Sequence, residues 1–439
     1  MGTGRASSNG QKWFYAYLPN GMAGGATSPL IPLFTRILGG TVADVGAVAA
    51  ASSIASVPAF IGWGNLSDHL RRRKAFVLVG FLGTALSLFL MGVSQSVSDF
   101  YLANLLAGVL GAASAPVGTV LILETTKQEG WASRIAVFSR IGGIGWITGL
   151  VLGVAWLVVS PLEESGGMRA LFVIGAALAV LSGLLAWRWI REPAEKVERR
   201  GLDFVDLHWR VERLRYLPMR ILHVLDLRNH VGLPHKYSRP LRRYLAVVFL
   251  LFSGFTAFYA IFPVYLRDVA GLTTPQVFAV FLSSQIASAF AYGRVGGWIR
   301  ARGGRRVQVV ASAARAGLFP AFLALPLLPG GPVAMCAMIL AFHGLVGLCW
   351  AAINVAGSTI VSELAPAGDR SGVLGAFNAV QGFGAILGPL TGGFVAHLFG
   401  FAAGIFASSA FIVIGTLFLL STGGSSEPDS PRHPYLRCP

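Results

Sequence analysis

The chain has 439 residues, of which 54% are hydrophobic and only 12% are charged. Soluble domains carry about 25% charged residues, so this composition excludes a soluble globular protein and predicts a chain that lipid solvates over most of its length. The net charge of +16 would also suit a nucleic-acid-binding protein. The positions of the charges along the chain are therefore needed to distinguish a nucleic-acid-binding protein from a membrane protein. The three cysteines form no metal-binding or disulfide pattern.

Twelve runs along the chain are long and apolar enough to cross a bilayer, which takes about 20 mostly apolar residues. They lie near residues 13–38, 42–66, 75–95, 99–123, 135–159, 168–190, 243–266, 273–299, 307–328, 332–360, 371–397 and 400–421. The sequence therefore predicts an all-α integral membrane protein with 12 transmembrane helices in two pseudo-symmetric six-helix bundles, 1–190 and 243–421. A basic, amphipathic cytoplasmic linker, 191–242, joins the bundles, and a cytoplasmic tail, 422–439, follows them.

Lysine and arginine are distributed unevenly over the predicted loops. If both termini are cytoplasmic, 29 of the 35 basic residues lie in cytoplasmic segments, three lie outside and three fall within spans. Cytoplasmic loops of membrane proteins carry such an excess. The sequence therefore predicts a multi-pass protein of the cytoplasmic membrane with both termini in the cytoplasm. The basic linker is expected to lie on the anionic inner leaflet, so no nucleic-acid partner is needed to explain the charge.

The two halves of the chain repeat each other at a fixed offset of 239 residues. Gly145 and Gly149 in the fifth span correspond to Gly384 and Gly388 in the eleventh. A duplicated six-span unit is typical of secondary transporters, whose substrate site lies between the repeats near the middle of the membrane.

The short basic loops are repeated as well. A glycine, an acid and a basic cluster follow the second span, and a basic cluster follows the eighth: Gly64, Asp68, Arg72 and Arg73 in the first copy, and Arg305 and Arg306 in the second. This pattern, together with the span count, resembles the major facilitator superfamily over essentially the whole chain. The resemblance implies a 12-span transporter that works by alternating access.

The resemblance also implies roles for the loop residues. Asp68 would act as a latch between the two halves, beside the arginine clusters, which also enforce orientation. Glu124 and its repeat partner Glu363 could pair with these clusters as gate residues, or be ordinary charges at helix ends. Gly145, Gly149, Gly384, Gly388 and Pro389 are expected to serve helix packing, and Leu150 stands where the family's antiporter pattern has proline.

The ionisable residues in the interiors of the spans, away from the span ends, are Arg140, Arg294, Arg315 and His343, and no acid lies in a span interior. Such residues are functional candidates by default. A cavity lined by arginine favours an anionic substrate, although Arg140 and Arg294 could instead extend to the interface. Arg315 is expected to be peripheral, because the ninth span packs peripherally in the family that the chain resembles. Carboxylate-based proton or sodium coupling has no obvious carrier, and His343 could carry a proton.

Polar residues that share a helix face supply the candidate substrate cavity. In the tenth span, His343, Trp350 and Asn354 lie on one face with Gly347 and Gly357, and Asn104 belongs to the matching stripe of the fourth span. Such a stripe could also be plain helix packing. The full set of predicted cavity residues is Asn20, Asn104, Arg140, Tyr259, Gln285, Arg294, His343, Trp350, Asn354, Asn378 and Gln381.

These features predict a secondary active transporter of a small molecule. The overall resemblance to 12-span exporters favours an exporter of drugs or other lipophilic compounds. The alternatives are a permease for small organic anions or for metabolites such as sugars. No phosphate-binding loop and no cluster of catalytic or metal-ligating residues is found, so neither an enzyme, a metal nor a cofactor is expected. The expected partners are the substrate and the lipid bilayer, with protons left open, no nucleic acid and a monomeric state.

Overall fold

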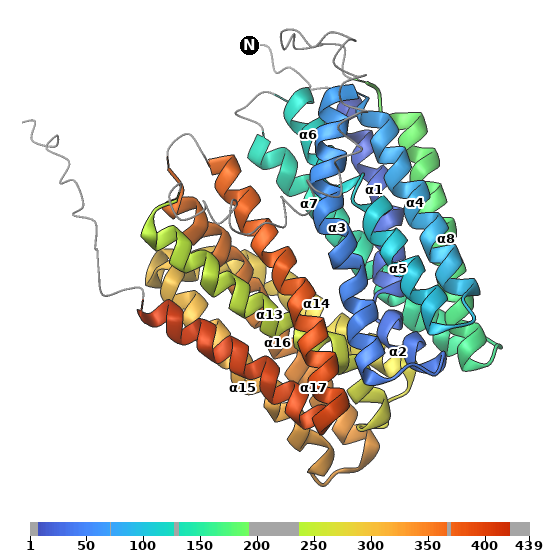
Figure 1. Cartoon of the computed structure of the whole chain (residues 1–439), viewed down its shortest axis with the longest axis vertical. Coiled ribbons are helices and arrows are strands. Elements are labelled where there is room, and N and C mark those ends of the chain that lie inside the picture. Colours follow the sequence, from blue (N-terminus) through green and yellow to red (C-terminus); the bar gives the residue numbers. More distant parts are fainter. Residues whose placement is uncertain (1–7, 71, 127–130, 193–236, 367–369, 422–439) are drawn as a thin grey trace, which may run out of the picture.

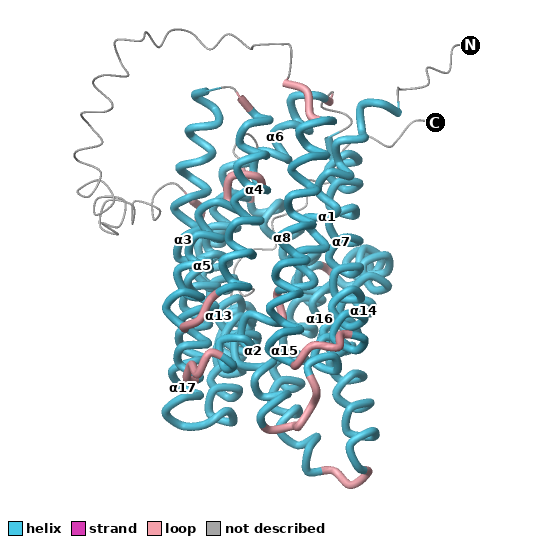
Figure 2. Tube along the Cα trace, turned by 90° about the vertical axis from the view of Figure 1, so that its right-hand side faces the viewer, coloured by secondary structure: helices cyan, strands magenta, loops and turns pink. Residues whose placement is uncertain are grey.

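The structure is a computed structural model that describes residues 8–70, 72–126, 131–192, 237–366 and 370–421. These residues form helices and short connections, with no strand among them (Figure 2). The predicted tail and nearly all of the predicted linker lie outside the described residues.

The first half of the chain begins with a 3-10 helix, η1, and continues through eight α-helices. Their bounds are η1 Ser8–Ala16, α1 Tyr17–Thr27, α2 Leu30–Ile37, α3 Val42–Leu70, α4 Arg73–Val93, α5 Val97–Gly111, α6 Ala115–Thr125, α7 Trp131–Val159 and α8 Glu164–Trp189. The second half contains α13 Arg239–Asp268, α14 Thr274–Arg302, α15 Gly304–Ala324, η3 Leu325–Leu327, α16 Gly331–Leu364 and α17 Arg370–Ser421. All twelve predicted spans coincide with helices of these two sets.

Eight of the described helical segments are long and apolar enough to cross a membrane. The first predicted span is divided into α1 and α2 at Ser28 and Pro29, and the fourth is divided into α5 and α6. The last two predicted spans follow each other in α17, where the backbone leaves helical geometry at Gly400, with φ of 85°. Only glycine adopts this conformation readily. The count of twelve crossings stays a prediction.

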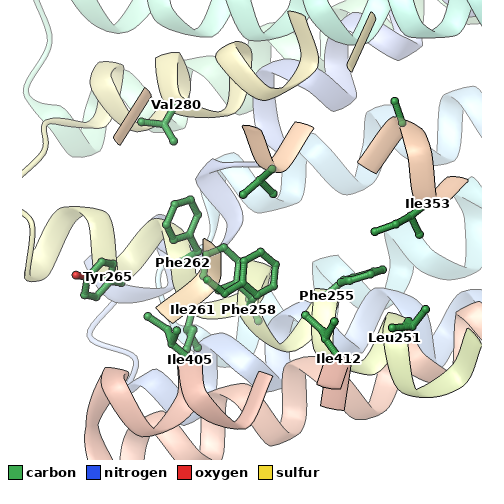
Figure 3. Packing of buried hydrophobic residues seen from close by; sticks show 14 of the residues in the cluster. Leu251, Phe255, Phe258, Ile261, Phe262, Tyr265, Val280, Ile353, Ile405 and Ile412 are labelled. Carbon is green, nitrogen blue, oxygen red and sulfur yellow. The ribbon is translucent and has the colours of Figure 1, made fainter. Parts of the chain in front are cut away.

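The helices gather into two groups (Figure 1). Helices α1 to α8 lie on one side and α13 to α17 on the other. Phe258 of α13 stacks on Phe319 of α15, with ring centroids 3.6 Å apart, and on Phe262 at 4.4 Å. On the other side of α13, Ile261 meets Ile405 of α17 (Figure 3). Helix α13 is therefore packed on opposite sides by α15 and α17.

Repeat-equivalent glycines make equivalent contacts in the two halves. Gly145 and Gly149 of α7 face the backbone of α1, and Gly384 and Gly388 of α17 face the backbone of α13. A Cβ atom added at Gly145 would lie 2.6 Å from the carbonyl oxygen of Leu18, closer than real atoms approach. Glycine is required here because the helix backbones themselves are in contact.

This close contact predicts that Gly145→Ala destabilises the protein by about 1–3 kcal/mol, because the new methyl group has to push two helices apart. Gly143→Ala is the matched control, since Gly143 lies two residues away with no neighbouring atom within 4 Å of its would-be Cβ. Thermal unfolding of the purified variants in detergent measures the difference. Equal unfolding temperatures for both variants would contradict the assigned packing.

Candidate functional site

A cavity of about 450 Å³ lies between the two helix groups. The first group contributes residues of α2, α3 and α7, among them Pro32, Ser53 and Trp146, and the second contributes residues of α13 to α17. Most of the lining is aromatic or aliphatic, and the lining residues include no carboxylate. A volume of this size is in the range of binding sites for drug-sized molecules.

Arg315 of α15 lies in the wall of this cavity and is only 1% exposed. Aromatic rings from three helices surround its guanidinium carbon. Its distances to the ring centroids are 4.1 Å for Phe255, 5.5 Å for Tyr259, 5.3 Å for Phe319 and 5.4 Å for Trp350. Each of these lies within the range of a cation–π interaction. We call Arg315 and these four residues the arginine cage.

The arginine cage leaves part of the guanidinium group without a partner. Nε and Nη1 of Arg315 are buried and make no hydrogen bond, and no ion pair joins Arg315 to a carboxylate in the described part of the chain. Aromatic rings attract the face of a guanidinium group, but its N–H groups point outward in the plane and still need acceptors. The cavity wall therefore contains a positive charge with unused donors.

His343 of α16 lies beside the arginine cage. Its Nδ1 is 2.7 Å from the carbonyl oxygen of Val280, which can only accept, so Nδ1 carries a proton. Its Nε2 is 3.3 Å from the hydroxyl of Tyr259. A neutral imidazole satisfies both contacts, with the hydroxyl donating to Nε2. His343 thereby fixes the position of Tyr259, which is also a member of the cage.

Ion pairs join the two helix groups at one end of the molecule. Arg267 Nη2 at the end of α13 lies 2.8 Å from Glu164 Oε2 at the start of α8. The hydroxyl of Thr274 donates to the other oxygen of Glu164 at 2.5 Å. Arg36 Nε of α2 lies 3.4 Å from Asp268 Oδ2. We call this the ion-paired end, and the opposite end, with Arg72, Arg73, Arg305 and Arg306, the basic end.

Close contacts between helices of the two groups, made by glycines, close the cavity on the side of the ion-paired end. A Cβ atom at Gly393 of α17 would lie 2.6 Å from Cα of Gly46 in α3. Between α7 and α14, a Cβ atom at Gly153 would lie 2.6 Å from Cδ1 of Phe278. The two groups diverge from this region toward the basic end (Figure 1). The cavity is thus closed on the side of the ion-paired end by packed helices and by ion pairs.

The predicted cavity residues are distributed over three environments. Those that line the main cavity are Tyr259, Gln285, His343 and Trp350. Asn354 and Gln381 line a second cavity of about 20 Å³. Those that line neither cavity are Asn20, Asn104, Arg140, Arg294 and Asn378. Asn104 is buried and donates to the carbonyl of Phe100, whereas Arg140 and Arg294 are exposed.

The predicted gate residues lie at the basic end. Nη1 of Arg73 donates to Ser67 Oγ at 2.7 Å, and Arg305 donates to the carbonyl oxygens of Leu419 and Leu420 at the end of α17. Gly64 has open space around it, and Arg72, Arg306 and Glu363 are exposed. The side chains of Asp68 and Glu124 lie outside the described residues, so the latch role of Asp68 stays a prediction.

Sequence reasoning missed two parts of this site. It placed Arg315 at the periphery, whereas the residue lies in the cavity wall. It also predicted no gate at the ion-paired end. The sequence contained one signal for this gate. Two basic and two acidic residues lie at span ends that are predicted to face the same side of the membrane: Arg36, Arg267, Glu164 and Asp268.

Residues 13–354 match the model of the Major Facilitator Superfamily. The chain belongs to the major facilitator superfamily. This membership confirms the predicted fold class, an all-α multi-pass membrane protein, and the predicted transporter family.

Several known members of the superfamily are similar to this chain. The multidrug resistance protein MdtG of Enterobacter lignolyticus is 29% identical over 196 residues, which cover 43% of this chain and 44% of that protein. MdtG of Salmonella arizonae is 28% identical over 196 residues, covering 43% of this chain and 46% of that protein. The matched stretch thus spans less than half the length of these relatives.

Solved structures of the superfamily share the fold. The nucleoside transporter NupG superposes with a TM-score of 0.71 and 17% identity, covering 95% of this chain and 99% of that one. A bacterial homologue of the human lysosomal transporter Spinster, in an inward-facing conformation, superposes with a TM-score of 0.65 and 15% identity, covering 94% of this chain and 95% of that one.

The ion pairs of this superfamily member predict that Glu164→Gln favours opening of the ion-paired end. A partly exposed ion pair contributes up to about 1 kcal/mol, so we expect the ratio of open to closed molecules to rise by up to about fivefold. Spin labels at Leu162→Cys and Val269→Cys, in a chain without its native cysteines, report the distance across this end by pulsed electron paramagnetic resonance.

The matched control is Glu163→Gln, which removes an exposed neighbouring acid that has no ion pair among those found in the described residues. A distance distribution that is the same for Glu164→Gln and Glu163→Gln would show that the pair does not hold this end closed.

Proposed function

We propose that the chain is a secondary active transporter that exports drugs or other lipophilic small molecules by alternating access, and that it does not act as an enzyme. Membership of the major facilitator superfamily supports transport. The similarity to proteins named multidrug resistance protein MdtG supports drugs as the substrate class. Lipophilic compounds reach such a cavity from an aqueous or a lipid phase, and its apolar walls bind them by burying apolar surface.

The observation that carries this proposal is the aromatic cavity between the two helix groups. Phe252, Phe281 and Trp350 line it together with Trp146 from the other group, and polar groups such as Gln285 are few. Aromatic side chains present large apolar surfaces and accept differently shaped ligands. A substrate that touches both groups would bind differently when the groups move relative to each other, as alternating access requires.

We further propose that the basic end faces the cytoplasm and that both termini are cytoplasmic, because the excess of basic residues marks that side. The ion-paired end then faces the outside, and the structure corresponds to a conformation that is closed to the outside. An exporter loads its substrate in such a conformation. The monomeric state and the absence of a nucleic-acid partner stay predictions.

The alternative of an organic-anion transporter is favoured by one specific observation. Arg315 puts a positive charge into the cavity wall, and no carboxylate lines the cavity. The cavity residues otherwise suit an apolar body, so the two substrate classes are compatible within one amphipathic molecule.

The proposed function predicts that cells containing the protein export the neutral fluorescent dye N-phenyl-1-naphthylamine faster than cells without it. Trp350→Ala should lower the rate by about three- to tenfold, because an aromatic contact with the dye is lost. Trp187→Ala, which removes a 64% exposed tryptophan of α8 that does not line the cavity, should leave the rate unchanged. Equal dye retention with and without the protein would contradict the proposal.

A further inference from the structure

The charge of Arg315 is not balanced by the protein around it. The residue is 1% exposed, and its cage consists of aromatic rings, among which the hydroxyl of Tyr259 hydrogen-bonds to the guanidinium group. Two of its nitrogens, Nε and Nη1, are nevertheless buried without a hydrogen-bond acceptor. A buried ion without a partner is strongly unfavourable, and replacing buried charged groups by apolar side chains is often neutral or stabilising. A residue that only stabilised the fold would therefore not be expected to be an arginine here.

The arginine cage fixes the position of the guanidinium group in the cavity wall. The guanidinium carbon lies over the ring of Phe255, 4.1 Å from the ring centroid. Tyr259 is fixed in turn by its contact with His343, at 3.3 Å. The guanidinium group is thus held in one orientation while donors in its plane stay unused, an arrangement that suits an incoming oxyanion.

The cavity around the arginine cage indicates what kind of molecule would carry the oxyanion. The cavity of about 450 Å³ that contains Arg315 is walled by aromatic and aliphatic side chains of both helix groups. No carboxylate lines it, so the field inside attracts negative charge. A ligand that satisfies both features has one anionic group and an apolar body.

We propose that Arg315 binds the anionic group of an amphipathic substrate, a carboxylate, phosphate, phosphonate or sulfonate attached to an apolar or aromatic body. This inference rests on the proposed function, because it assigns a substrate class to the same cavity. The cage buries the unused N–H groups of Arg315 in the ligand-free structure, so the cage side chains move aside when the oxyanion binds and accepts hydrogen bonds from these groups. The body packs against Trp350, Phe281 and Trp146. The oxyanion can belong to a dissolved organic acid or to the headgroup of an anionic lipid.

Two fluorescent molecules with nearly the same aromatic body test the proposal. 8-Anilinonaphthalene-1-sulfonate is anionic, and N-phenyl-1-naphthylamine lacks the sulfonate. The full chain in phosphatidylcholine nanodiscs should bind both, which is measured by energy transfer from tryptophan. Arg315→Met should weaken binding of the sulfonate by at least about tenfold, because a charge-assisted hydrogen bond is lost, and should leave binding of the neutral dye within about twofold of that of the unaltered protein.

Two further variants serve as comparisons. Arg315→Lys keeps the charge but loses the planar donors, so we expect an affinity for the sulfonate between those of the unaltered protein and Arg315→Met. Arg294→Met removes an exposed arginine that lines neither cavity, and we expect it to leave both affinities unchanged.

The stability of the ligand-free variants separates binding from a structural role. If Arg315 is kept for its ligand, Arg315→Met unfolds at the same temperature as the unaltered protein or at a higher one. A clear loss of stability in Arg315→Met, combined with an unchanged affinity for the sulfonate, would overturn the proposal and leave Arg315 as a packing residue.

The same experiments distinguish failure of the anion site at Arg315 from failure of the proposed export function. Export of the neutral dye with no effect of Arg315→Met on binding of the sulfonate overturns the anion site alone. Absence of export of either dye contradicts the proposed function. Repeating the binding measurement with phosphatidylglycerol in the nanodiscs identifies the source of the oxyanion: competition points to a lipid headgroup, and unchanged affinity for the sulfonate points to a dissolved acid.

Discussion

Polar groups that enter the bilayer have to find their partners inside the protein, and this requirement shapes the whole structure. Helices satisfy it for the backbone. Serine and threonine side chains satisfy it by donating to the carbonyl one turn earlier, as Ser253 does to Phe249. His343 satisfies it through Val280 and Tyr259. In the described residues, the buried side chains with an unpartnered polar atom are only Asn20, Arg315 and Ser409, and of these Arg315 alone is charged.

The same requirement, combined with the internal repeat, explains how the two halves can be built alike and still move. Glycines at equivalent positions join α7 to α1 and α17 to α13, so each half is packed through its own backbone contacts. Between the halves, contacts are concentrated toward the ion-paired end, where Arg267 and Glu164 meet. Strong packing within the halves, with the contacts between the halves gathered toward one end as partly exposed ion pairs and a close approach of Gly46 and Gly393, suits a molecule that opens at one end while the other closes.

The sequence was sufficient to predict the helical segments, because the apolar runs are long and the bilayer leaves few alternatives. It also predicted His343, Tyr259, Trp350 and Gln285 as cavity residues, since they share helix faces or lie in spans with few polar groups, and these four line the cavity. It could not predict which face of α15 turns inward, because one arginine in a span of small residues gives little periodicity. The environment of Arg315 depends on aromatic residues of α13 and α16 that are distant in sequence. The ion pairs between the halves likewise join residues that are distant in sequence, so they depend on how the two bundles pack against each other.

The central claim is that Arg315 holds an uncompensated charge inside the cavity for the anionic group of a substrate. A structure of the chain determined with bound 8-anilinonaphthalene-1-sulfonate tests it most directly. The account predicts the sulfonate within hydrogen-bonding distance of Arg315 and the aromatic rings against Trp350 in the cavity between the helix groups. A ligand bound elsewhere, or bound in the cavity with its sulfonate turned away from Arg315, would contradict it.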